Sequence, residues 1–138
     1  MINAFIGTPV VVEAGENLLF TGGRAATRAS QICNGGWLYH AYGSGQFMIS
    51  KPGIYKVDFT GVVTAAAAGD VTLEVRTNGE ALAGLEMSET IAAAGLANLA
   101  AQGLIVVPCH ASVTVTVANE SGTDVTVNNA SLSLMRVC

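Results

Sequence analysis

Large apolar and polar side chains alternate along residues 55–64, just after the Pro52-Gly53 corner. The odd positions that carry large apolar side chains are Tyr55, Val57, Phe59 and Val63, and the even positions that carry polar ones are Lys56, Asp58, Thr60 and Thr64. A period of two residues is typical of a β-strand with one face buried and the other exposed. This segment is therefore predicted to be a strand on the surface of a core.

Similar short segments recur along the whole chain, separated by turn-forming residues. The predicted strands are Pro9–Val12, Leu18–Phe20, Trp37–Tyr42, Gln46–Ile49, Tyr55–Thr64, Val71–Arg76, Ala81–Met87, Ala97–Val107, Val113–Val117 and a closing strand that includes Val125 and Leu134. Residues 21–36 are rich in Gly, Ala, Ser and Thr and are expected to form a long surface loop, with at most one short strand near Gln31–Cys33. About ten short strands indicate an all-β protein, built as a sandwich or barrel.

Two short segments predict a specific local structure, a hairpin turn and a β-bulge. Asn78-Gly79 lies between two strands and favours a tight hairpin, because both residues tolerate positive φ. In the closing strand the apolar residues move from odd positions (Val125, Val127) to even ones (Leu132, Leu134). Such a change of phase requires one extra residue, so we expect a β-bulge near Asn128-Asn129.

The segment 88–102 has an ambiguous pattern. Its Ala and Leu content suits a helix on propensity alone. Gly95 interrupts it and strand-like residues follow, so we interpret it as an Ala-Gly loop from Glu89 to Gly95 and then the strand Ala97–Val107. A short helix in this segment remains the alternative.

The composition adds an expectation about assembly. The chain is 51% hydrophobic and only 12% charged, whereas an ordinary domain has about 25% charged residues. Its length suits a single domain, residues 1–138. No apolar run approaches the roughly 20 residues of a membrane span, and the first residues do not have the pattern of a signal peptide. A chain so poor in charge would expose large apolar patches as a monomer, so we expect an oligomer.

The charged residues limit the classes of partner that the chain can bind, and the cysteines indicate whether it contains a disulfide. A net charge of −4 and a pI near 4.9 argue against nucleic-acid binding, which requires clustered basic residues. Arg24 and Arg28 form the only close basic pair in a loop and could pair with carboxylates of a partner, although a solvated loop is the favoured explanation. Cys33, Cys109 and Cys138 are odd in number, which favours free thiols; a single bridge stays open.

No constellation of residues in the sequence predicts catalysis, a cofactor or a metal site. His40 and His110 are the only imidazoles, and they lie far apart in sequence. Ser44 lies in Gly43-Ser44-Gly45, which lacks the frame of a nucleophile elbow. Gly-rich stretches precede no predicted helix and so form no phosphate loop. The chain is predicted not to be an enzyme.

Three aromatic residues lie within six positions of one another. Trp37, Tyr39 and Tyr42 could stack on sugar rings or anchor a protein contact if exposed, or fill the core if buried. We favour burial or a contact between subunits for Trp37 and Tyr39, with Tyr42 as a weak candidate for a partner contact.

Three segments in the second two thirds of the chain resemble a known family. Residues Phe47–Phe59 are similar to the F-x-x-x-x-x-G-x-Y-x-x-x-F block of C1q-like and tumour-necrosis-factor-like (TNF-like) domains. Val71–Gly79 resembles their next strand and turn, and Asn129–Val137 resembles their closing strand. The resemblance extends from Phe47 to the end of the chain. It is nearest to the alanine-rich, charge-poor variant found in bacteriophage structural proteins and in spore-surface proteins of Gram-positive bacteria.

The resemblance implies a compact jelly-roll sandwich that forms homotrimers. Tyr55 and Phe59, with Phe47 and Leu134, would then face either the core or the threefold axis, and the sequence does not decide between the two. The calcium sites of the family are not expected, because acidic residues are not clustered in any loop. Small residues would suit tight packing of subunits around the axis.

The resemblance also implies a function. It indicates a non-enzymatic structural protein on the exterior of a bacteriophage particle, most simply a trimeric capsid decoration protein that contacts the major capsid protein or other virion proteins. The alternatives are a fibre or spike head that binds a host-surface glycan, and an adhesion module on a spore or cell surface. Neither nucleic acid nor a membrane is an expected partner.

Overall fold

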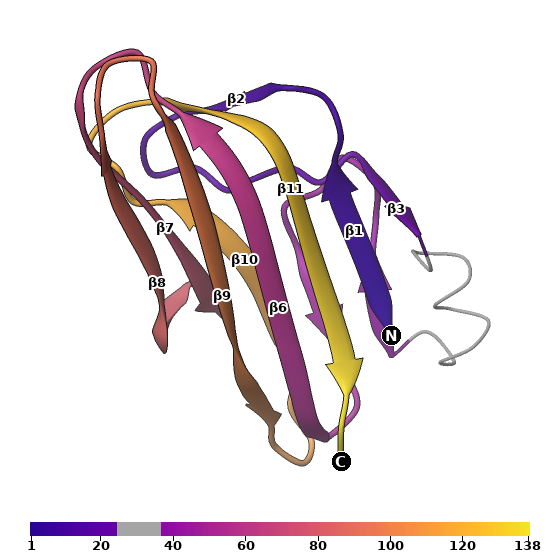
Figure 1. Cartoon of the computed structure of the whole chain (residues 1–138). Helices are drawn as coiled ribbons and strands as arrows, with labels where there is room; N and C mark the ends of the chain where they lie inside the picture. The colour runs from indigo at the N-terminus through magenta and orange to yellow at the C-terminus, as the bar shows by residue number, and fades with distance from the viewer. Residues whose placement is uncertain (25–36) are drawn as a thin grey trace.

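The computed structural model describes residues 1–24 and 37–138, which form two antiparallel β-sheets packed face to face (Figure 1). Part of the predicted loop, including Arg28, Cys33 and the proposed strand near Gln31–Cys33, lies outside the described residues. The described residues form no helix, and so none long and apolar enough to cross a membrane.

The six-stranded sheet carries the closing strand in its middle. Its order is β3-β1-β11-β6-β9, and β2 also pairs with β11. The strands are β1 (Ile2–Ile6), β2 (Val10–Val12), β3 (Gly22–Arg24), β6 (Gly53–Thr64), β9 (Leu96–Val107) and β11 (Val125–Arg136). Figure 1 shows the outer face of this sheet, with β6, β9 and β11 as long neighbouring strands.

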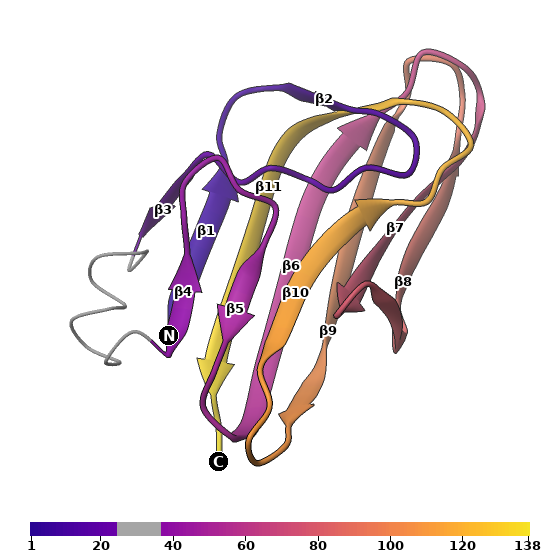
Figure 2. The same cartoon turned by 180° about the vertical axis from the view of Figure 1, so that it is seen from behind.

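The five-stranded sheet covers the other side of the core. Figure 2 shows it from behind, in the order β4-β5-β10-β7-β8. Its strands are β4 (Leu38–His40), β5 (Phe47–Ile49), β7 (Gly69–Thr77), β8 (Glu80–Ile91) and β10 (Val113–Asn119). Both chain termini lie at one end of the sandwich, and β2 lies at the opposite end (Figure 1).

The structure confirms the all-β jelly-roll sandwich and both local signals. Asn78 and Gly79 have φ values of 51° and 81° and connect β7 to β8 as a tight hairpin. Opposite β6, the register of β11 shifts between Val127 and Asn129, so the predicted bulge is present. Asn128 is the extra residue, and it moves the apolar positions of β11 back onto the core side.

Several strand predictions are wrong. The sequence does not predict β1, because the large apolar side chain of half-buried Phe5 hides the alternation of buried Ile2, Ala4 and Ile6. Leu18–Phe20 is not a strand but an irregular strap: the Leu18 amide donates to Val117 O of β10, 2.8 Å away, and the Phe20 amide donates to Ser44 O in the loop before β5. Gly22–Arg24, expected within a loop, forms β3.

The ambiguous segment 88–102 also differs from the prediction. It contains no helix, and the loop is shorter than predicted: β8 continues to Ile91, and residues 92–95 turn the chain into β9. Both strands lie at sheet edges and are Ala-rich, so tertiary pairing overrides the helical propensity of their residues.

The core lies between the sheets and contains the large side chains that the sequence singles out. Phe47, Tyr55, Phe59 and Leu134 are at most 1% exposed. The His40 ring stacks on Phe47 with centroids 4.1 Å apart, and the edge of Phe20 meets Phe47 at 5.3 Å. Burial of each such side chain contributes on the order of 1.5–3 kcal/mol to folding.

Candidate assembly surface

The outer face of β6, β9 and β11 is a regular surface formed by the three longest strands of the six-stranded sheet. Because inward and outward side chains alternate, the even positions of β6 and β9 and the odd positions of β11 after the bulge point outward. We call these residues the sheet face: Ile54, Lys56, Asp58, Thr60, Val62, Thr64, Leu96, Asn98, Ala100, Gln102, Leu104, Val106, Asn129, Ser131, Ser133 and Met135.

Strand register arranges the sheet face in rows across the three strands. Ala100 lies beside Thr60, and Thr60 beside Ser131, which makes the middle row small and flat. One row toward the termini, Gln102, Asp58 and Ser133 are neighbours. Small residues in the middle let another backbone or sheet approach closely.

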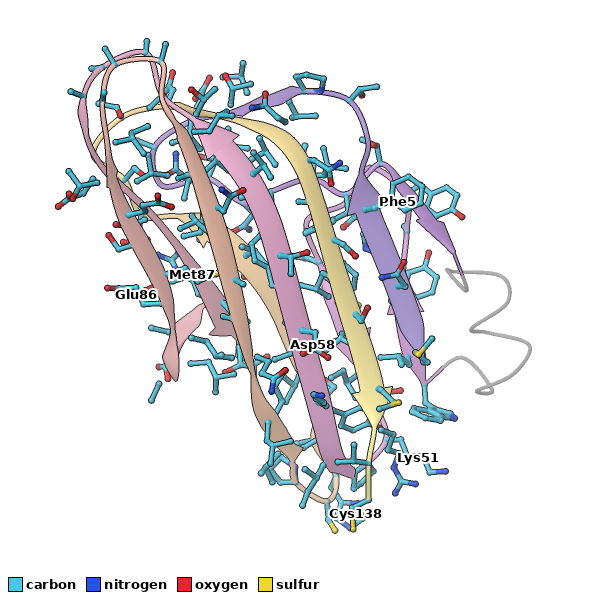
Figure 3. The ribbon with its side chains drawn as sticks, viewed as in Figure 1. Phe5, Lys51, Asp58, Glu86, Met87 and Cys138 are labelled. Atoms are coloured by element: carbon cyan, nitrogen blue, oxygen red, sulfur yellow. The ribbon has the colours of Figure 1, made fainter. Side chains whose placement is uncertain are left out.

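Only two residues of the sheet face are charged, and they neutralise each other. Lys56 Nζ lies 3.7 Å from Asp58 Oδ2. The sequence has ten acidic residues, so the other nine lie elsewhere, on β7, β8 and the connecting segments. These are Glu13, Glu16, Asp70, Glu74, Glu80, Glu86, Glu89, Glu120 and Asp124. Figure 3 shows this separation, with Asp58 on β6 and Glu86 on β8.

Hydrogen bonds within the sheet satisfy several polar groups near this face. Asn3 Nδ2 donates to Ser131 Oγ at 3.1 Å and to Ser133 Oγ at 2.8 Å. These serine hydroxyls are therefore already engaged with β1. The two hollows along β6 and β9 are shallow, about 240 and 330 Å³ in volume, and hold no cluster of titratable groups.

The end of the sheet face nearest the termini is apolar. Leu104, Val106 and Met135 are 59%, 67% and 42% exposed. Leu104 and Met135 flank Lys56 in one row. Apolar side chains of this size, grouped on a face with little charge, indicate a surface that another protein covers.

The predicted interface residues lie in different places. Phe47, Tyr55, Phe59 and Leu134 fill the core of this chain, so they support the sheet face from beneath and are not part of it. Tyr55 donates its hydroxyl to Lys51 O at 2.8 Å. Burial raises the pKa of Tyr55 above its ordinary value of 10.0, and the nearby Arg136 guanidinium opposes that rise.

The three clustered aromatic residues do not form one platform. The partly buried Trp37 ring meets the Tyr55 ring edge-on at 6.0 Å, and Lys51 Nζ lies 5.1 Å from its centroid. Tyr39 is half-buried on β4, while exposed Tyr42 follows β4 and donates its hydroxyl to Gly23 O. The backbone of Arg24 belongs to β3; Arg28 lies outside the described residues.

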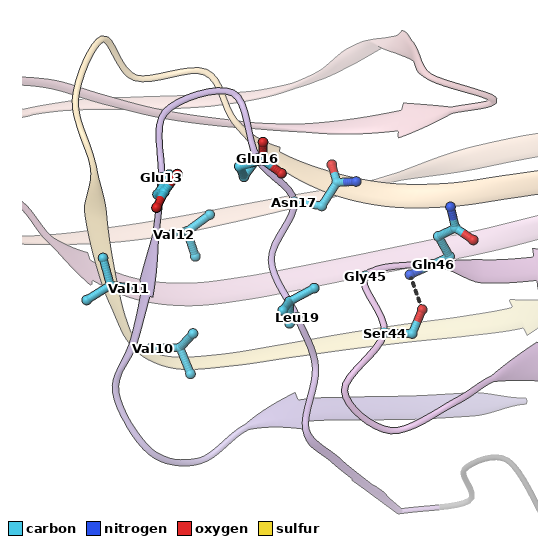
Figure 4. Close-up of a pocket in the computed structure, with 10 residues that line it drawn as sticks. All are labelled: Val10, Val11, Val12, Glu13, Glu16, Asn17, Leu19, Ser44, Gly45 and Gln46. Atoms are coloured by element: carbon cyan, nitrogen blue, oxygen red, sulfur yellow. Dashed lines mark hydrogen bonds between the residues drawn. The ribbon is translucent and has the colours of Figure 1, made fainter.

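A separate hollow, of about 540 Å³, lies at the end of the sandwich opposite the termini (Figure 4). We call it the cap groove; it is lined by Val10, Val11, Val12, Glu13, Glu16, Asn17, Leu19, Ser44, Gly45 and Gln46. The Ser44 hydroxyl accepts a hydrogen bond from the Gln46 amide, as in a turn. Among residues 1–24 and 37–138, no three His, Cys, Asp or Glu side chains could together hold a metal ion.

This geometry defines the class of fold, a jelly-roll sandwich. Comparison with solved structures shows which proteins share this fold. The chain is similar to the globular domain of zebrafish complement 1qA, with a TM-score of 0.73, 9% identity and coverage of 99% of this chain and 96% of that one. It is equally similar to Eiger TNF from S. frugiperda, with a TM-score of 0.73, 10% identity and coverage of 99% and 92%. Murine APRIL gives a TM-score of 0.63 at 11% identity, covering 95% and 96%.

The chain therefore has the jelly-roll fold of C1q-like and TNF-like domains. Comparison of the sequence with protein-family models and with curated proteins gives no match. The likeness extends over the front third of the chain as well, which the sequence resemblance does not reach.

Sequence reasoning missed the apolar end of the sheet face. A signal was present, since Leu104 and Val106 occupy the outward positions of a strand whose inward positions are also apolar. Apolar residues on both faces of a strand are typical of a strand that is covered on both sides.

Proposed function

We propose that the chain is a non-enzymatic structural protein that assembles as a homotrimer through the sheet face. The observation that supports this most directly is the charge distribution: along β6, β9 and β11 the sheet face carries one self-neutralised ion pair and exposes Leu104, Val106 and Met135. The trimeric state follows the assembly that the resemblance to C1q-like and TNF-like domains implies.

The energetics favour burial of this face. Each large apolar side chain that is fully removed from water contributes on the order of 1.5–3 kcal/mol. Burial of the single ion pair costs desolvation energy, but a face with many charges would cost far more. The flat middle row allows the close approach that such a contact requires.

The oligomeric state tests the proposal. Light scattering coupled to size exclusion should give a mass three times that of the 14.0 kDa chain. Ala100→Lys places an unpaired cation in the middle row and should shift the protein to monomers. Ser88→Lys adds the same charge on the outer side of β8, where Ser88 is exposed, and should leave the trimer intact.

Circular dichroism of both variants controls for folding, since both positions are exposed. A wild-type protein that stays monomeric at high micromolar concentration contradicts the proposal. So does equal loss of assembly in the two lysine variants.

For the biological role, we propose capsid decoration on the exterior of a bacteriophage particle, with the major capsid protein as partner. The support is the resemblance to the alanine-rich, charge-poor phage variant. A glycan-binding fibre head is less favoured, because Trp37, Tyr39 and Tyr42 contact different elements. Mass spectrometry of purified phage particles from the source strain should detect the chain in fixed proportion to the capsid protein; its absence from all particles contradicts this role.

A further inference from the structure

The two ends of the sandwich differ in charge, and each has a hollow with apolar walls. At the end that carries the termini, a hollow of about 390 Å³ is lined by Met1, Trp37, Met135, Arg136, Val137 and Cys138. We call it the basal hollow. Lys51 stacks on the ring of Trp37 at its edge, and Figure 3 shows Lys51 and Cys138 at this end of the molecule. Its chemistry is apolar and cationic.

The cap groove at the other end has the opposite charge. Two large apolar side chains that line it are exposed to solvent: Val11 is 65% exposed and Leu19 is 45% exposed. Glu13 and Glu16 are exposed as well and line the same hollow, and Figure 4 shows the Val11 side chain on the other side of β2 from Leu19. Its chemistry is apolar and anionic.

Among the described residues, the charged side chains at the two ends form no ion pair, although Arg136 Nη2 donates to Pro52 O and Lys51 Nζ lies over the Trp37 ring. Among the described residues, neither Lys51 nor Arg136 lies within 4 Å of a carboxylate, and neither Glu13 nor Glu16 lies within 4 Å of a cationic group. The other two basic side chains that the structure describes are paired: Lys56 with Asp58, and Arg76 with Glu74 and Glu120. Carboxylates such as Glu80 and Glu86 on β8 also lack a cationic partner, but the described basic side chains without a carboxylate partner both lie at the basal hollow.

We propose that copies of this chain associate end to end, with the cap groove of one copy seated on the basal hollow of the next. Glu13 and Glu16 then face Lys51 and Arg136, while Val11 and Leu19 pack toward Trp37 and Met135. The complementary halves of the contact are both present on one chain, and this favours a second copy over a foreign acidic partner. Because the two surfaces differ, the contact is heterologous and extends into rows.

The inference goes beyond the proposed trimer and does not depend on it. If the chain is trimeric, three cap grooves and three basal hollows face opposite ways along the threefold axis, and stacking joins trimers through three contacts at once. Several weak contacts acting together give much higher affinity than one. If it is monomeric, single chains stack by the same surfaces.

A charge-swap experiment tests the proposal by sedimentation velocity. The mean mass of the wild-type protein should rise with concentration at 20 mM salt and fall back at 1 M salt, where charges are screened beyond about 3 Å. The double variants Lys51→Glu/Arg136→Glu and Glu13→Lys/Glu16→Lys each present like charges at both ends, so each alone should lose the association. An equimolar mixture should regain it, because each variant complements the other.

A matched control is Glu80→Lys/Glu86→Lys, which makes the same change of net charge at exposed positions of β8 and should associate like the wild type. Thermal melting verifies that each variant is folded, and Lys51→Gln/Arg136→Gln replaces the reversal if it unfolds. A mixture that fails to associate, or a wild type that never does, overturns the proposal. Binding of wild-type chain to polyglutamate without self-association overturns it in favour of a foreign acidic partner.

The outcome is separable from that of the trimer test. The unit that associates end to end is either the trimer or the single chain. The Ala100→Lys variant, which should be monomeric, keeps both end surfaces unchanged and should therefore still associate end to end at low salt. Loss of stacking with an intact trimer, or the reverse, identifies which of the two proposals is wrong.

Discussion

Tyr55 shows how one side chain serves both the core and the surface of this sandwich. Its ring lies in the core against Trp37, and its hydroxyl reaches Lys51 O at the edge of the basal hollow. The odd-even alternation in the sequence correctly indicates that it points inward. The pattern could not show the hydroxyl contact, because Lys51 lies beyond the Pro52-Gly53 corner and its carbonyl is positioned by that turn.

The raised pKa of Tyr55 predicts a specific loss of stability in alkali. The folded state holds the phenol proton more tightly than the unfolded state, so this contribution is fully present below pH 10 and is lost as the pH rises through the folded-state pKa. Denaturant unfolding of the wild type between pH 9 and 12 should show this decline. Tyr55→Phe should remove that component, at a cost of about 1 kcal/mol at pH 7 for the lost hydrogen bond.

Tyr42→Phe is the matched control, because that hydroxyl is exposed. It should keep the alkaline decline of the wild type. The same decline in the Tyr55 variant as in the wild type would contradict the assignment.

At the scale of elements, a strand can be predicted from the sequence when the side chains on its two faces differ strongly in polarity. In β6 large apolar and polar residues alternate, and its position and inward face follow from the sequence alone. In β9, by contrast, apolar residues lie on both faces, such as Ile105 inward and Val106 outward. The sequence therefore predicts a strand over Ala97–Val107, close to the observed β9, but the contrast between its two faces is weak. The sheet face could not be recognised beforehand, because residues of β6, β9 and β11 become neighbours only through long-range pairing.

The turn between β8 and β9 contains a position where a single change should stabilise the fold. Ala94 has φ of 58°, a left-handed conformation that costs a residue with a Cβ about 1–2 kcal/mol. Ala94→Gly removes that strain but adds freedom to the unfolded chain, for a net gain of up to about 1 kcal/mol. Chemical denaturation measures the gain.

Ala93→Gly is the neighbouring control, since Ala93 is not among the residues with positive φ. It should lower the free energy of unfolding. A loss of stability in both variants would show that Ala94 is not strained.

At the scale of the whole molecule, a modest net charge hides a strong separation. The overall charge of −4 suggests a mildly acidic protein, yet the sheet face is neutral, the cap groove is anionic and the basal hollow is cationic. Composition predicted association but could not say through which surfaces, because that depends on where the topology places each charge. The proposed lateral contacts through the sheet face and the proposed axial contacts through the ends are compatible, since they use different sides of the sandwich.

The position of β11 also has a consequence for biosynthesis. This last strand pairs with β1, β2 and β6, and its register joins Ile2 to Leu134. The strand β1 therefore cannot pair with β11 until residue 136 has been synthesised. Pairing between residues so distant in sequence slows folding, because the loop-closure entropy must be overcome before the contacts form.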